Sequence, residues 1–150
     1  MIFIQLDACE KMLEDAQSTF PDECCGFLFG QEINGERHIS EIMIVDNAKE
    51  GDKRRRFEIT AKDYLRAERF SLKFQLELLG VYHSHPSHPA IPSEHDRVAA
   101  LPFFSYVIVS IFEDHKIDVR SWRLNDERQF DPEAINAPPL EIQASNALTH

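Results

Sequence analysis

The chain has 150 residues, of which 43% are hydrophobic and 28% are charged. These values are typical of one soluble globular domain and leave too few residues for two ordinary ones. The formal net charge of −10 opposes binding to phosphate backbones, so nucleic acid is not an expected partner. Residues 1–7 are apolar but have no basic leader and are too short for a signal peptide or a membrane span, so we expect a cytoplasmic protein with no membrane partner.

The first predicted helix covers residues 7–20, where apolar side chains recur at spacings of three and four and Asp7 can serve as the N-cap. The short apolar run over residues 23–30 then predicts a strand buried on both faces. The three cysteines include one adjacent pair and no Cys-X-X-Cys pair. We therefore expect free, buried thiols rather than a disulfide framework or a structural zinc site.

A hairpin is expected next, because the dipeptide Asn34-Gly35 lies between two strand-like runs and both residues tolerate positive φ. After a polar loop, Thr60 is the predicted N-cap of a long amphipathic helix that extends to about Leu79. Gly80 fits the C-terminal stop of this helix. The chain would then turn directly into the next strand.

The C-terminal half predicts a buried strand over residues 105–112, a turn, and an alternating strand over residues 116–124. The order of helices and strands favours an α/β or α+β domain with a mixed, strongly bent sheet flanked by helices. The polar, proline-containing end of the chain predicts a loosely ordered tail. We therefore expect one domain over residues 1–135 and a tail over residues 136–150.

The segment from Gly80 to Asp96 holds the densest functional signal. If the chain from Gly80 to His85 is extended, His83 and His85 project from the same face of one strand, which is the spacing for two ligands of one metal. Three prolines end this strand, and Ser93 then has the position of an N-cap for a short helix. Asp96, in the first turn of that helix, can reach back as a third ligand.

Two neutral nitrogens and one carboxylate, with a fourth position open to water, form the ligand set of a catalytic zinc site. Ser93 and Asp96 taken alone are more simply explained as a helix cap. The joint occurrence of both histidines, the serine and the aspartate favours the metal site. The other two histidines of the segment, His88 and His95, are interpreted as solvated residues.

The string His83-Ser84-His85-Pro86 followed by Ser93 and Asp96 resembles the full signature of the JAMM, or MPN-plus, metalloprotease family. The resemblance implies a deaminase-like mixed sheet, one Zn²⁺ held by the two histidines and the aspartate, and a serine near the metal. It also implies a catalytic glutamate on another element. Family members remove ubiquitin or ubiquitin-like proteins, or trim bacterial sulfur-carrier proteins, after a Gly-Gly tail.

Glu23 is the candidate for that glutamate, because the Glu-Cys-Cys-Gly segment resembles the one that carries it in the family. Without a metal nearby, Glu23 is more simply explained as a solvated carboxylate at the end of a strand. Beside a zinc-bound water it is a general base that takes the proton during attack on a carbonyl and returns it to the leaving amine. The shorter Asp22 lies in an expected turn and is the weaker candidate.

A basic run over residues 53–56 has a plain interpretation as a solvated loop. Alternatively, it is a local patch that meets an acidic partner or a carboxylate near the site. An Arg-aromatic pair occurs at this place in the family, which makes Arg56 and Phe57 the residues of interest. Their role does not follow from the sequence.

The predicted function is a zinc-dependent metalloprotease that cleaves after the Gly-Gly tail of a ubiquitin-like or sulfur-carrier (ThiS/MoaD-like) protein, with Ser93 donating to the developing oxyanion. The short chain favours a small carrier protein as substrate. One alternative is a metal-dependent amidohydrolase of small molecules, although the Pro-Cys-X-X-Cys motif of zinc deaminases is absent. The other is a non-catalytic interaction module, as in metal-free relatives that have lost ligands.

Overall fold

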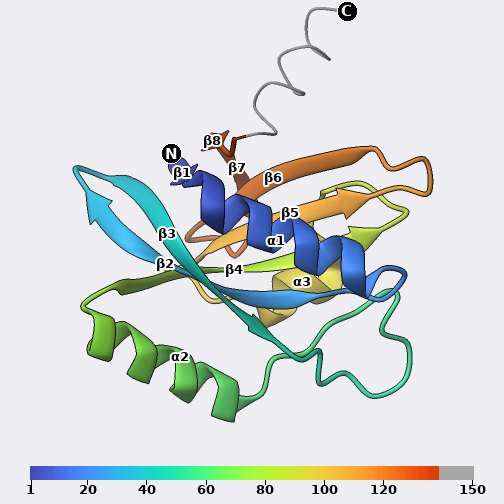
Figure 1. Ribbon diagram of the computed structural model, residues 1–150, viewed down its shortest axis with the longest axis horizontal. Helices are drawn as coiled ribbons and strands as arrows, with labels where there is room; N and C mark the ends of the chain where they lie inside the picture. Colours follow the sequence, from blue (N-terminus) through green and yellow to red (C-terminus); the bar gives the residue numbers. More distant parts are fainter. Residues whose placement is uncertain (139–150) are drawn as a thin grey trace, which may run out of the picture.

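The structure, a computed structural model, describes residues 1–138. These residues form three helices and eight strands (Figure 1). In chain order the elements are β1 (Ile2–Ile4), α1 (Leu6–Thr19), β2 (Cys25–Ile33), β3 (Glu36–Val45), α2 (Ala61–Phe74), β4 (Glu77–Pro86), α3 (Glu94–Ala99), β5 (Ser105–Ile111), β6 (Ile117–Leu124), β7 (Phe130–Glu133) and β8 (Ile135–Asn136). The expected α/β composition is confirmed.

The strands form one eight-stranded sheet in the order β7-β6-β5-β4-β2-β3-β1-β8. β4 pairs with β5 in parallel, and β1 pairs in parallel with both β3 and β8, whereas the remaining neighbours are antiparallel. The pairing of β2 with both of its neighbours shifts register around Phe29, and such irregularities bend a strand. The predicted mixed, bent sheet is confirmed, and β4 lies near its centre.

The predicted hairpin is also confirmed. Asn34 and Gly35 have φ angles of 53° and 79° and connect β2 to β3, which pair antiparallel as far as Ile33 and Glu36. Thr60 caps α2 as expected, because its Oγ1 accepts a hydrogen bond of 3.1 Å from the backbone N–H of Asp63. Local signals of this kind depend on a few neighbouring residues, which explains why the sequence identifies them.

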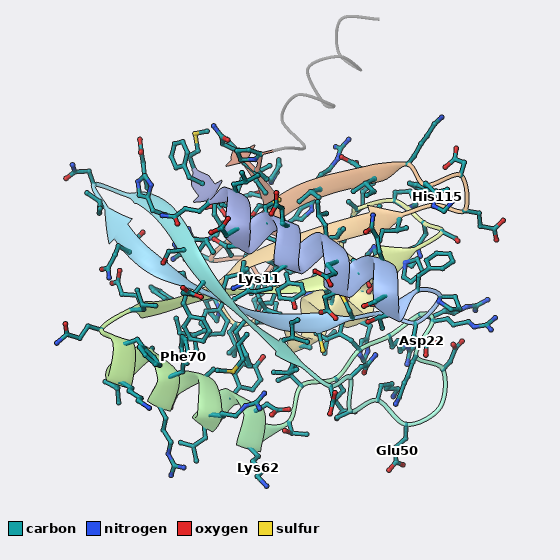
Figure 2. The ribbon with its side chains drawn as sticks, viewed as in Figure 1. Lys11, Asp22, Glu50, Lys62, Phe70 and His115 are labelled. Atoms are coloured by element: carbon teal, nitrogen blue, oxygen red, sulfur yellow. The ribbon has the colours of Figure 1, made fainter. Side chains whose placement is uncertain are left out.

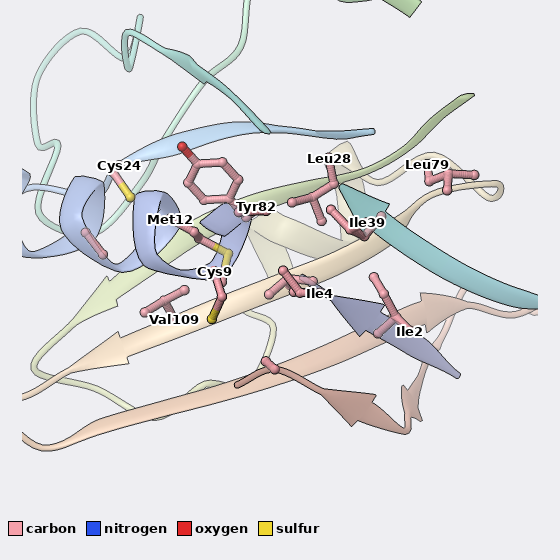
Figure 3. Close-up of a cluster of buried hydrophobic side chains, with 14 of the residues drawn as sticks. Ile2, Ile4, Cys9, Met12, Cys24, Leu28, Ile39, Leu79, Tyr82 and Val109 are labelled. Carbon is pink, nitrogen blue, oxygen red and sulfur yellow. The ribbon is translucent and has the colours of Figure 1, made fainter. Parts of the chain in front are cut away.

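Helices cover both faces of the sheet. α1 lies across one face, where its apolar side chains pack on the sheet (Figures 1 and 3). α2 lies on the other face: Phe70 points toward the sheet and Lys62 points away from it (Figure 2). The ring of Phe70 lies 4.7 Å from that of Phe29 in β2, measured between centroids. The three cysteines are free and buried, as predicted.

Four predicted boundaries are wrong. α1 has Gln5 rather than Asp7 as its N-cap, and Asp7 lies in the first turn. The next strand begins at Cys25 rather than residue 23. The second helix ends at Phe74, and β4 begins at Glu77. Leu79 and Gly80 are therefore strand residues rather than the end of a helix.

The requirement for glycine at position 80 comes from sheet packing. A Cβ atom on Gly80 would collide with the backbone carbonyl oxygen of Ser105 in β5. The helix instead ends through Gln75, which adopts the left-handed conformation with φ of 55°. Leu76 continued the helical spacing of apolar residues, which is why the periodicity overestimated the helix.

The sequence did not reveal β7 and β8. β8 pairs with β1, so Asn136, expected in the tail, belongs to the sheet and Ala137 is buried. The remainder of the expected tail, residues 139–150, lies outside the described residues. Over residues 1–138, none of the helices has both the length and the apolar character needed to cross a membrane.

Candidate metal centre

The central strand β4 presents His83 and His85 on the same face of the sheet. Both side chains are buried, with exposed fractions of 1% and 2%. Ser84 lies between them and points to the opposite face, where its Oγ accepts a hydrogen bond of 2.8 Å from the backbone N–H of Cys24. The alternation of a β-strand therefore places the two histidines on one face, as the sequence predicted, and the intervening serine on the other.

α3 brings Asp96 to the same place. Ser93 is the N-cap: its Oγ accepts a hydrogen bond of 3.0 Å from the backbone N–H of Asp96, and its own N–H donates to Asp96 Oδ2 at 2.9 Å. This capping box fixes the rotamer of the aspartate. The two interpretations of Ser93 and Asp96 in the sequence, as a cap and as part of a polar site, are therefore compatible.

Three potential donor atoms converge at this centre. His83 Nε2 and His85 Nε2 lie 3.1 Å apart, and Asp96 Oδ2 lies 3.3 Å from the first and 3.2 Å from the second. Ligands that surround a zinc ion tetrahedrally at 2.0 to 2.2 Å are separated by roughly 3.3 to 3.6 Å. The donor atoms therefore have nearly the mutual spacing that one divalent cation requires.

The electrostatics of Asp96 favour its charged form. Burial raises its pKa, but this effect is outweighed by the charge and hydrogen bond of His83, the hydrogen bond of His85 and the N–H of Ser93. The pKa of Asp96 is therefore held well below its ordinary value. A carboxylate that stays ionised inside the protein can serve as an anionic ligand.

Glu23, which precedes β2, completes the cluster. Its potential ligand atom and those of His83 and His85 all lie within 4.8 Å of one another. The residue is 1% exposed, and neither carboxylate oxygen has a hydrogen-bond partner among the described residues. Burial, followed by the charges of Asp96 and Asp52, raises the pKa of Glu23 to about 9.

A buried carboxylate without partners is costly for a folded protein. A divalent cation beside Glu23, or a water bound to that cation, would satisfy its oxygens. The residues present therefore fit a metal ion. The backbone holds the glutamate in place, because its N–H donates to the carbonyl of Lys53 at 2.6 Å and its carbonyl accepts from Asn47 Nδ2 at 3.1 Å.

Neighbouring groups orient the two histidine rings. His85 Nδ1 lies 2.8 Å from the carbonyl oxygen of Pro89, so the Nδ1–H tautomer leaves Nε2 free to face the centre. The ring of His83 stacks on Phe57, with 4.3 Å between centroids. Phe57 therefore helps to orient the His83 ring, a role that the sequence did not define. The neighbouring Arg56 is exposed.

His88 and His95 were interpreted as solvated loop or helix-surface residues, and neither is fully exposed. Each is half-buried. The His88 ring stacks on His85 with 4.2 Å between centroids, and its Nδ1 lies 2.7 Å from the carbonyl oxygen of Pro86. Burial lowers the pKa of His88, opposed by its hydrogen bond to Pro86. The His-Pro dipeptide occurs twice, at His85 and again three residues later at His88. This repeat is the feature of the sequence that could have indicated that the His88 ring lies beside His85.

Tyr82, which flanks the histidines in sequence, belongs to the core on the other face of the sheet. It is fully buried, and its hydroxyl donates a hydrogen bond of 2.8 Å to Asp15 of α1. Residues 53–56 are exposed. The described contact between this basic run and the centre is the hydrogen bond that the backbone N–H of Glu23 donates to the carbonyl of Lys53.

Comparison with known protein families matches residues 6–125 to the family described as prokaryotic homologs of the JAB domain. The chain belongs to this family. The resemblance drawn from the His-Ser-His-Pro segment is therefore confirmed. The match covers the structure from α1 to the loop after β6 and includes every residue of the candidate centre.

Individual relatives extend this comparison. The chain is 31% identical over 129 residues to a CysO-cysteine peptidase of Mycobacterium tuberculosis, which covers 84% of each chain. It is 25% identical over 107 residues to a desampylase of Pyrococcus furiosus, over 71% of this chain and 70% of that one. The solution structure of protein DSY2949 from Desulfitobacterium hafniense has a TM-score of 0.80 and 30% identity, covering 90% of this chain and 91% of the other.

Proposed function

We propose that this protein is a zinc-dependent peptidase that hydrolyses the peptide or isopeptide bond after the C-terminal Gly-Gly of a ubiquitin-like or sulfur-carrier protein. The observation that carries the proposal is the convergence of His83 Nε2, His85 Nε2 and Asp96 Oδ2 within 3.3 Å, beside the unpartnered carboxylate of Glu23. Membership in the JAB family supports it. A peptidase and a desampylase among its relatives support hydrolysis of a protein conjugate.

His83, His85 and Asp96 are the proposed ligands. All three side chains are buried and held by packing or hydrogen bonds before any cation binds. When bound, a zinc ion supplies Lewis acidity, which polarises a carbonyl and lowers the pKa of a water. Three protein ligands leave one position open, as catalysis requires.

Glu23 is the proposed general base rather than a fourth ligand. Asp96 lies within hydrogen-bond distance of both histidines, whereas the Glu23 oxygens have no such contact in the described residues. An unengaged carboxylate at this position can hold a proton on one oxygen. Glu23 would take that proton from the attacking water and transfer it to the leaving nitrogen, the step that general acid–base catalysis accelerates by roughly 10² to 10⁴.

Ser93 is the proposed donor to the oxyanion. Its Oγ already accepts the N–H of Asp96, and a serine hydroxyl can donate its own hydrogen at the same time. The residue is exposed, so a substrate carbonyl can approach it. One well-aimed donor of this kind lowers a barrier by about 2.7 to 4 kcal/mol.

A decisive experiment measures zinc per chain together with cleavage of a Gly-Gly-linked fusion protein. Wild type should bind one zinc and cleave after the glycines, and His85→Ala should lose both properties. Glu23→Gln should keep the zinc and lose roughly 10² to 10⁴ in kcat. His115→Asn is the matched control, because His115 is an exposed turn residue with φ of 66° (Figure 2), a conformation that asparagine tolerates.

The two rival functions give different outcomes in that experiment. Zinc binding without cleavage of any Gly-Gly fusion, together with turnover of small amides, would favour the small-molecule hydrolase. Failure of wild type to bind stoichiometric zinc in zinc-replete medium would remove the proposed mechanism. The interaction module would then be the better account.

A further inference from the structure

A cavity of about 370 Å³ lies beside the metal centre. Two proposed ligands, His83 and Asp96, form part of its wall. The rest of the lining comes from the segment before α2, from α2, β4, β5 and β7, and from α3 and the residues just before it, and includes Phe57, Tyr64, Val81, Tyr106, Ile108 and Phe130. The wall is predominantly aromatic and aliphatic.

The cavity is large enough to hold an apolar group of a ligand. An apolar cavity of about 150 Å³ already binds benzene. This cavity has more than twice that volume, and it opens toward solvent beside the exposed residues Glu58 and Ala99. It can hold a large apolar side chain.

The position of Glu23 indicates which part of a substrate would enter. Among the described residues, the lining includes His83 and Asp96 but neither Glu23 nor His85. Glu23 must lie near the leaving nitrogen if it protonates that atom. The leaving group would therefore occupy the Glu23 side of the centre, and the acyl side would extend past His83 and Asp96 into the cavity.

We propose that this cavity is a specificity subsite for one large apolar side chain located one or two residues before the Gly-Gly of the substrate. The inference rests on the proposed function and specifies its substrate. Glycines have no side chain to offer, so the first group that can fill the cavity lies upstream of them. Adjacent side chains of an extended peptide point to opposite faces, so one of the two upstream positions should enter and the other should not.

The test measures the binding of peptides to zinc-loaded Glu23→Gln, in which turnover does not interfere. The three tail peptides end in Leu-Ser-Gly-Gly, Ser-Leu-Gly-Gly and Ser-Ser-Gly-Gly. One leucine peptide should bind ten- to a hundredfold more tightly than the serine peptide, the gain expected for burying one leucine. The other leucine peptide should bind as the serine peptide does. The same preference should appear in kcat/KM when wild type cleaves the corresponding fusions.

A second substitution, introduced into both proteins, tests whether the preference arises in this cavity. Ala99→Leu fills the cavity from its exposed rim and should abolish the leucine preference while zinc content stays at one per chain. Val98→Leu is the matched control: Val98 is 66% exposed and is not among the lining residues. It should leave the preference unchanged.

Equal binding of all three peptides, or a leucine preference that survives Ala99→Leu, would overturn the subsite. This outcome is distinct from failure of the proposed function. If wild type cleaves no fusion but the peptides show a leucine preference that Ala99→Leu removes, the subsite stands and the hydrolysis does not. If wild type cleaves every fusion equally well, the hydrolysis stands and the subsite does not.

Discussion

Two buried polar clusters occupy opposite ends of β4 and β5. They differ in how many of their polar atoms have hydrogen-bond partners within the protein. At the start of these strands, Arg37 of β3 is 1% exposed. It donates hydrogen bonds to the carbonyl of Leu79 at 2.8 Å, to Ser105 Oγ at 3.1 Å and to the carbonyl of Phe103 at 2.7 Å. The Ser105 hydroxyl in turn donates to Glu133 of β7 at 2.8 Å.

The candidate metal centre lies at the other end. There, the two oxygens of Glu23 and the Nδ1 of His83 have no hydrogen-bond partner in the described part of the chain. The Arg37 cluster is closer to complete: the guanidinium Nε has no hydrogen bond but lies 3.6 Å from the carboxylate of Glu32. Both clusters carry ionisable groups inside the protein. The Arg37 cluster is therefore largely satisfied within the chain, whereas the Glu23 carboxylate has no partner among the described residues.

The largest expected effect comes from a substitution that breaks the Arg37 cluster. Arg37→Met should destabilise the protein by about 3 kcal/mol or more, because it leaves buried carbonyl and hydroxyl groups without their donor. Urea unfolding of the metal-free protein measures the change. Arg66→Met is the control, since Arg66 is exposed on α2 and pairs with Asp63 at 3.6 Å, an interaction worth less than about 1 kcal/mol.

An equal response of the two arginine variants would contradict a structural role for the Arg37 cluster. A large loss of stability with unchanged zinc stoichiometry in the folded protein would separate the two clusters. This separation is expected because Arg37 has no described contact with the residues of the centre.

At the Glu23 cluster we expect a substitution to increase the stability of the metal-free protein rather than to decrease it. Glu23→Gln should stabilise the metal-free protein at pH 8 by roughly 1 to 3 kcal/mol, because the neutral amide avoids the cost of burying a group that is ionised in the unfolded chain at this pH. Burial raises the pKa of Glu23 from 4.5 to about 9. Between these values the unfolded chain loses a proton that the folded chain keeps, so the stability of wild type falls as pH rises through this window.

The variant does not titrate at this position, so its advantage should grow from pH 5 to pH 8. Urea unfolding curves at both pH values, without metal, measure it. Glu58→Gln is the control, because Glu58 is exposed. Added zinc should bind both proteins but reduce the advantage, because the charge of the cation favours the ionised carboxylate of Glu23 in wild type. A wild type that is more stable than Glu23→Gln at pH 8 without metal would show that Glu23 has a partner within the fold.

The contrast also explains what the sequence could predict. His83, His85, Ser93 and Asp96 lie within one short segment, so strand alternation and a capping box specify their arrangement from local residues. The position of Glu23 beside them depends on the pairing of β2 with β4. That pairing joins distant parts of the chain, and only the family resemblance indicated it.

Non-local pairing explains the failures as well. The burial of Arg37 does not follow from its own strand, where neighbouring polar side chains are exposed or half-buried; it depends on Ser105 and Phe103 from a distant loop and strand. In the same way β8 exists because Ile135 pairs with Ile2. A strand of only two residues gives no local signal of such a pairing.

The smallest expected effect concerns the residues that support the proposed metal ligand His85. The His88 ring stacks on His85 at 4.2 Å, and the backbone carbonyl of His88 accepts a hydrogen bond of 2.6 Å from Ser110 of β5. The stack limits the motion of His85 before a metal binds. His88→Ala should therefore weaken zinc binding about tenfold, the lower end of the effect of removing groups that orient ligands. Competition with a chromophoric chelator measures this affinity.

His88→Phe separates the stack from the hydrogen bond. Phenylalanine keeps an aromatic ring against His85 but cannot bond to the carbonyl of Pro86, as His88 Nδ1 does at 2.7 Å. If the stack positions His85, His88→Phe should bind zinc nearly as tightly as wild type, and the exposed control His115→Asn should be unchanged. Equal losses in His88→Ala and His88→Phe would assign the effect to the hydrogen bond with Pro86. Wild-type affinity in His88→Ala would mean that the hydrogen bond of His85 to Pro89 is sufficient to hold the ligand.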